Sequence, residues 1–141
     1  MFAQHRSAAA SYRSLDVETM VDGADPHRLV EMLYDGAVVQ VAKARHALAR
    51  QDVAAKCEAT TRAIRIIDEG LKAALDSRAG DVARNLDALY DYMTRTLLSA
   101  NLKNSDALYG EVEKLLGDLR GAWRGPVDGC LRGAPATRSL N

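Results

Sequence analysis

The stretch ADPHRLVEMLYDGA, at residues 24–37, contains a helix start signal followed by the first turns of an amphipathic helix. Asp25 can cap this helix by accepting a backbone N–H, and Pro26 suits the first helical position because its missing N–H would be unbonded anyway. Apolar residues then recur every three or four positions, at Val30, Leu33, Ala37, Val41, Ala44 and Leu48. This is the period of a helix with one buried face. The stretch therefore predicts a helix that begins at Pro26 and ends near Gln51.

Three further apolar stripes with the same spacing follow along the chain, and short polar breaks separate them. The second stripe is Val53, Cys57, Thr60, Ile64, Ile67, Leu71 and Leu75. The third is Val82, Leu86, Leu89, Met93, Leu97 and Ala100, and the fourth is Leu108, Val112, Leu115, Leu119 and Ala122. Asp52 can cap the second helix, and Asn104 or Ser105 can cap the fourth. The breaks lie at residues 76–80 and 101–105.

Short connections force neighbouring helices to run antiparallel, and four one-sided stripes can meet in one core. The sequence thus predicts an all-α protein with an antiparallel four-helix bundle over residues 25–124. We expect the core to include Leu33, Ile64, Leu89, Met93 and Leu115. We expect residues 1–24 to form a flexible N-terminal segment, and residues 125–141, which contain Pro126 and Pro135, to form a disordered tail.

The composition excludes several classes of partner. The chain has 141 residues, with 19 basic and 19 acidic side chains. A formal charge of zero gives no long-range attraction to nucleic acid or to anionic lipid. Residues 1–10 lack the apolar core of a signal peptide, and no apolar run is long enough to insert stably in a membrane. Cys57 and Cys130 have no paired framework, which is typical of a reduced cytosolic protein. We therefore expect a cytoplasmic location.

The chemistry of an enzyme or a metal site is not indicated by the sequence. A di-metal bundle needs Glu-x-x-His pairs, and none of His5, His27 and His46 lies three residues after a glutamate. Cys57 has no neighbouring base to activate it, and no glycine-rich phosphate loop occurs. We expect no catalysis, no cofactor and no metal.

Apolar residues outside the four core stripes are candidates for binding another protein. The second helix has an extra run of mostly small residues: Ala59, Ala63, Ile66, Gly70 and Ala73. The third helix has Leu98 and Leu102, which point away from Leu97 on a helical wheel. We predict a groove read by Ile66 and Leu98, with Gly36 and Gly70 giving access to the backbone. The alternative is a wider core, with single surface leucines tolerated. For Tyr109, Leu116 and Trp123 we favour the core.

Several stretches together resemble the FliS family of flagellar export chaperones. The run at residues 24–37 resembles the start of the FliS bundle, and RNLDALYDYM at residues 84–93 resembles its third helix. ANLKN at residues 100–104 is similar to the turn that follows, and LRGAW at residues 119–123 is similar to the end of the fourth helix. The resemblance covers about residues 12–124 in the family's order.

The resemblance implies a cytoplasmic chaperone for flagellin. Such a chaperone binds the disordered C-terminal segment of flagellin, prevents premature polymerisation and presents flagellin to the flagellar export apparatus. It also implies that the N-terminal segment covers a client groove when no client is bound, here through Tyr12, Leu15 and Val17. Whether two copies of the chain form a homodimer when no client is bound is left open by the sequence. The same fold would also suit a helical adaptor or co-chaperone for other flagellar proteins.

Overall fold

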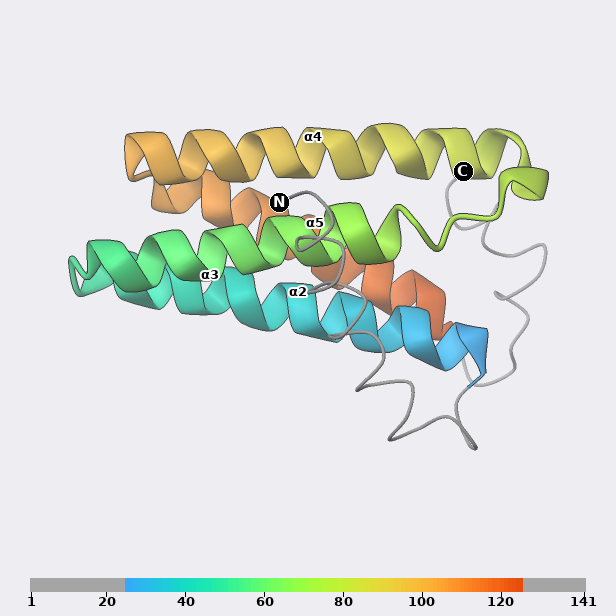
Figure 1. The fold of residues 1–141 in the computed structure, drawn as a ribbon, viewed down its shortest axis with the longest axis horizontal. Coiled ribbons are helices and arrows are strands. Elements are labelled where there is room, and N and C mark those ends of the chain that lie inside the picture. The colour runs from blue at the N-terminus through green and yellow to red at the C-terminus, as the bar shows by residue number, and fades with distance from the viewer. Residues whose placement is uncertain (1–24, 126–141) are drawn as a thin grey trace, which may run out of the picture.

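The computed structural model describes residues 25–125, which form four long helices joined by short connections. Helix α2 spans Pro26–Ala49 and α3 spans Val53–Arg65. A π-helical segment, η1 (Ile66–Leu71), continues α3, and a short 3-10 turn, η2 (Ser77–Ala79), precedes α4. Helix α4 spans Asp81–Lys103 and α5 spans Asp106–Arg124. Consecutive helices run in opposite directions and pack side by side (Figure 1). The predicted antiparallel all-α bundle is confirmed. The predicted N-terminal segment 1–24 and all but the first residue of the predicted tail 125–141 lie outside the described residues.

The predicted caps define the helix ends. Asp25 accepts a hydrogen bond from Arg28 N at 2.8 Å, and Asp52 accepts one from Ala55 N at 3.1 Å. The sequence left two residues open as the cap of the fourth helix, and the structure assigns a role to each. Ser105 is the N-cap of α5, whereas Asn104 ends α4 in the left-handed conformation at φ 53°. Asparagine tolerates this conformation better than most residues, which allows the sharp reversal between α4 and α5.

The four predicted stripes meet in one core. Ala37, Val41, Met93, Leu97 and Val112 have no exposed surface. Of the five residues named above as expected core, Met93 is fully buried, whereas the other four are only partly buried and pack against the core: Leu33, Ile64, Leu89 and Leu115. Tyr109 and Leu116 are fully buried and Trp123 packs against the core, as we favoured. Val53 departs from the prediction: it is 64% exposed, at the first position of α3, where residues 51–54 are all exposed.

The second helix is not the uninterrupted α-helix that the sequence predicts. From Ile66 to Leu71 the backbone adopts a π-helix, whose wider turn alters the direction in which each side chain points. Ile66 and Ile67 are both buried, and so are Gly70 and Leu71. On a helical wheel drawn at 100° per residue, Ile66 points away from Ile67 and Gly70 points away from Leu71. The wheel therefore placed Ile66 and Gly70 outside the core. The expected exposure of Ile66 is therefore wrong; its exposed fraction is 8%.

Buried polar side chains pair with one another inside the bundle. The hydroxyls of Tyr34 and Tyr90 lie 2.6 Å apart, and those of Thr60 and Tyr109 also lie 2.6 Å apart. Burial raises the pKa of both Tyr34 and Tyr90 above the usual value. Lys56, only 4% exposed, donates to Asn101 O at 3.0 Å and to the side chain of Asn104. Its ammonium thus lies at the C-terminal end of α4, where the helix dipole favours a cation.

Candidate protein-binding surface

The most exposed apolar side chains of α4 are Leu98 and Leu102, with exposed fractions of 58% and 84%. They lie four residues apart and therefore share one face of the helix, whereas Met93 and Leu97 point into the core. Single exposed leucines are normal on protein surfaces, but two adjacent ones form a continuous apolar strip. The predicted exposure of this pair is confirmed.

The contacts between α3 and α4 locate the strip. Asn101 accepts from Lys56 Nζ through its backbone, and its side-chain oxygen lies 3.6 Å from Cys57 Sγ. Asn101 is one turn from Leu98, so Leu98 flanks the line along which α3 and α4 meet. We call the surface formed by Val53, Leu98 and Leu102 along this line the α3–α4 seam. Val53 belongs to it because it lies one turn before Cys57, which contacts Asn101, and because it lines a small hollow of about 350 Å³ with Asn104 at the end of α4.

The opposite end of the line between α3 and α4 is charged. Lys72 Nζ lies 2.8 Å from a carboxylate oxygen of Asp91 and 3.5 Å from one of Asp87. The hydrogen bond to Asp91 raises the pKa of Lys72 above its usual value. A partner that follows the whole line would thus meet apolar side chains near one end and an ion-paired cluster near the other.

The remaining predicted site residues do not join the exposed leucines. Ala63, Ile66 and Gly70 belong to buried positions of the bundle, and Ala73 is exposed in the turn after η1. A side chain added at Gly70 would approach Leu33 Cδ2 to 2.9 Å, so this glycine permits close packing against α2. Gly36 is half-buried on α2. The predicted open groove along the second helix is therefore wrong as geometry, and contact between these residues and a client stays a prediction. Tyr12, Leu15 and Val17 lie outside the described residues.

The other seam of the bundle, between α2 and α5, is closed by ion pairs. Arg45 binds Asp106 and Glu113 at 2.7 Å each, and Arg124 binds Glu31 at 2.6 Å. The Arg45 guanidinium lowers the pKa of Asp106. At the far end the Trp123 ring stacks on His27, with a centroid distance of 4.6 Å, and its Nε1 donates to His27 O at 2.8 Å. These contacts have no local signal in the sequence, because they join residues about 60–100 positions apart.

Two features of residues 25–125 bear on the class of protein. Within residues 25–125 no three His, Cys, Asp or Glu side chains are grouped so that they could hold a metal ion. No helix in this part of the chain is both long and apolar enough to cross a membrane. The fold and its exposed leucines define a helical-bundle protein with an apolar surface suited to binding another protein.

Comparison with known proteins identifies the family. The family model described as flagellar protein FliS matches residues 8–128. The flagellar secretion chaperone FliS of Salmonella typhimurium is 49% identical over 119 residues, which cover 84% of this chain and 88% of that protein. The flagellar secretion chaperone FliSB of Pseudomonas aeruginosa is 40% identical over 84% of this chain and 94% of its own length. FliS of Escherichia coli is 36% identical over 81% of this chain and 85% of its own length. The chain belongs to the FliS family, which is a chaperone family and not a class of enzymes.

Proposed function

We propose that this chain is a cytoplasmic export chaperone that binds the disordered C-terminal region of flagellin. By holding that region it prevents premature polymerisation and delivers flagellin to the flagellar secretion apparatus. Membership of the FliS family supports the chaperone role. The observation on which the site proposal rests is the exposed pair Leu98 and Leu102 beside Val53 on the α3–α4 seam.

An amphipathic segment of the client can bury its apolar side chains on this seam. Burial of apolar surface offsets the entropy that a disordered segment loses when it becomes ordered. We therefore propose that binding is coupled to folding, with helix gained by the client. Ala63, Ile66 and Gly70 stay candidates for client contact only if the bundle opens near η1, whereas Gly36 and Ala73 need no such opening.

Calorimetry with the C-terminal segment of flagellin tests the proposal. We expect a negative heat-capacity change and a gain of helix by circular dichroism. The double variant Leu98→Asp/Leu102→Asp should abolish binding while the bundle stays folded, because both side chains are exposed. Tyr92→Ser, at another exposed position of α4, is the matched control. Normal binding by the double variant would remove the seam from the site, and co-purification of a different flagellar protein in place of flagellin would favour the adaptor role.

Two further experiments test the role of the N-terminal segment and the oligomeric state. We propose that Tyr12, Leu15 and Val17 compete with the client, so that deletion of residues 1–22 tightens flagellin binding. Weaker binding after deletion would make the segment part of the client site. Light scattering with and without the flagellin segment tests whether the client-free chain forms a homodimer.

A further inference from the structure

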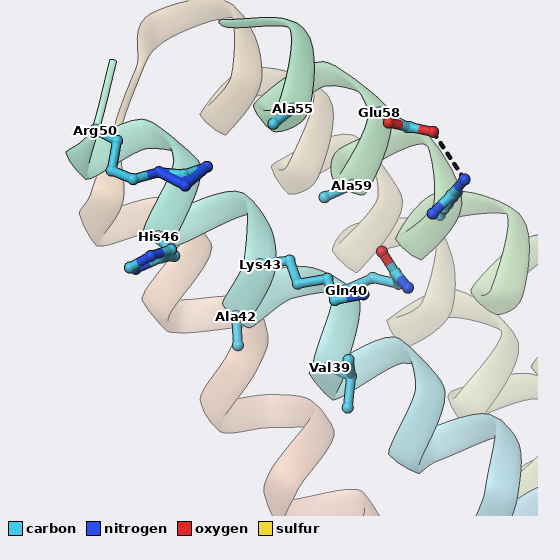
Figure 2. A pocket seen from close by; sticks show the side chains of 10 residues that line it. Val39, Gln40, Ala42, Lys43, His46, Arg50, Ala55, Glu58 and Ala59 are labelled. Atoms are coloured by element: carbon cyan, nitrogen blue, oxygen red, sulfur yellow. Dashed lines mark hydrogen bonds and ion pairs between the residues drawn. The ribbon is translucent and has the colours of Figure 1, made fainter. Parts of the chain in front are cut away.

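A groove of about 500 Å³ runs along the outer side of the α2–α3 hairpin (Figure 2). It lies on the side of α3 that faces α2, whereas the α3–α4 seam lies on the side that faces α4. Its apolar lining is made of small side chains, Ala42, Ala55 and Ala59, with the half-exposed Val39 at one end. Small side chains on facing helices leave room for a third helix to approach closely.

Cationic side chains border this lining. Lys43 and His46 on α2 and Arg50 at its C-cap recur at intervals of three and four residues, and Arg62 lies across from them on α3. Figure 2 shows Arg50 and His46 at one end of the groove and Val39 at the other. With His46 neutral, the lining has three cations and one anion, Glu58, and a net charge of +2.

The ion pairs in and beside the groove are solvent-exposed and leave its cations available. Glu58 binds Arg62 at 2.7 Å, with side-chain exposures of 62% and 56%. Arg50 reaches Asp52 only at 3.5 Å, and Lys43 forms no ion pair with any described residue. Exposed pairs of this kind are weak, so a carboxylate of a partner can compete for these cations.

We propose that the α2–α3 groove is a docking site for an acidic amphipathic helix of a partner protein other than the client. The groove extends along α2 from Val39 to Arg50, about 16 Å at ~1.5 Å per residue, which accommodates about three turns of helix. The apolar face of the partner helix packs on the alanines. Its carboxylates flank that face and meet Lys43 and Arg50 on one side and Arg62 on the other.

The charge pattern favours this occupant over nucleic acid or an anionic membrane. A polyphosphate backbone would gain nothing from the alanine lining and would be repelled by Glu58. The whole chain has a formal charge of zero, so it has no general attraction for polyanions. A helix with small or apolar side chains on one face and acidic side chains on both flanks of that face matches both the lining and its border.

A designed peptide tests the groove directly. The probe is a labelled peptide of about 16 residues with alanine and leucine on one face and glutamate on both flanks, and its control is a scrambled peptide of the same composition. Fluorescence anisotropy should show saturable binding of the probe to the full chain, and the binding should weaken as NaCl is raised from about 50 to 300 mM. Lys43→Glu/Arg50→Glu should weaken it by at least about tenfold. The control Arg84→Glu/Lys114→Glu, at exposed positions of α4 and α5, should change it by less than about twofold.

Other outcomes would overturn the proposal. These are equal binding of the scrambled peptide, equal loss in the control variant, or binding only of an RNA oligonucleotide or of phosphatidylglycerol vesicles. A change confined to self-association would assign the groove to a second copy of this chain. The result is separate from the flagellin assay, because Leu98→Asp/Leu102→Asp should leave binding of the designed peptide unchanged whether or not it abolishes flagellin binding.

Discussion

The buried pair of Tyr34 and Tyr90 should behave as one energetic unit. Both side chains are 2% exposed, and their hydroxyls lie 2.6 Å apart, joining α2 to α4. Tyr34→Phe or Tyr90→Phe alone removes the hydrogen bond and leaves the other hydroxyl buried without it. Such a loss typically costs ~1–3 kcal/mol of unfolding free energy. Removing both hydroxyls leaves no orphan, so the double variant should be about as stable as either single variant, or more so.

A double-mutant cycle measures this coupling. Urea unfolding followed by circular dichroism gives the unfolding free energy of the four proteins. We expect the sum of the two single losses to exceed the loss in the double variant by ~1–3 kcal/mol. Tyr92→Phe is the control, because Tyr92 is 40% exposed and bonds to Glu111 at the surface; it should leave stability close to that of the wild type. Additive losses would refute the idea that the two hydroxyls satisfy each other.

Three further predictions follow from the same core. The pKa values of Tyr34 and Tyr90 are raised above 10.0 in the folded protein, so the unfolded chain loses these protons first as the pH rises. The unfolding free energy should therefore be unaffected below about pH 10 and should fall above it by ~1.4 kcal/mol per pH unit for each tyrosine. A pH series of urea unfolding measures this slope, and a double Tyr→Phe variant that kept the slope would contradict the assignment. Ile66→Asp should destabilise the bundle by more than ~3 kcal/mol in thermal unfolding, whereas Leu98→Asp should cost less than ~0.5 kcal/mol; the reverse order would place Ile66 at the surface. Lys56→Met should cost ~1–3 kcal/mol in urea, since it removes the donor to Asn101 O, and an unchanged midpoint would count against this role.

The fold could be predicted closely because its signals are local. The helix ends are defined by contacts within three or four residues, at Asp25 and Pro26, at Asp52, and at Asn104 and Ser105. Apolar spacing then identifies the face of each helix that packs inward. Both kinds of signal can be seen in one stretch of sequence without knowledge of the rest.

The exposure of the candidate site residues was predicted only in part, since exposure depends on packing between helices. Leu98 and Leu102 lie on a regular α-helix, where the 100° wheel holds. Ile66 and Gly70 lie in a π-helix, which no local sequence pattern predicted. Gly70 is also covered by Leu33 from another helix. The groove cations could have been noticed, because Lys43, His46 and Arg50 follow helical spacing. Their relation to Ala55 and Ala59 needs the α2–α3 pairing.

Helix α3 contributes to both proposed surfaces, and the geometry of a helix keeps them apart. Ala55 and Ala59 face the groove beside α2, while Val53 and Cys57, displaced by two residues, lie toward α4. Positions two apart on an α-helix point about 200° from each other, so one ligand cannot cover both sets. Between the two surfaces the buried Lys56 bonds α3 to the end of α4 and fixes the orientation of the helix. Substitutions in the groove should therefore leave the affinity for flagellin unchanged, and substitutions in the seam should leave the affinity for the acidic helix unchanged. An acidic helix and a flagellin segment should be able to occupy one molecule at the same time.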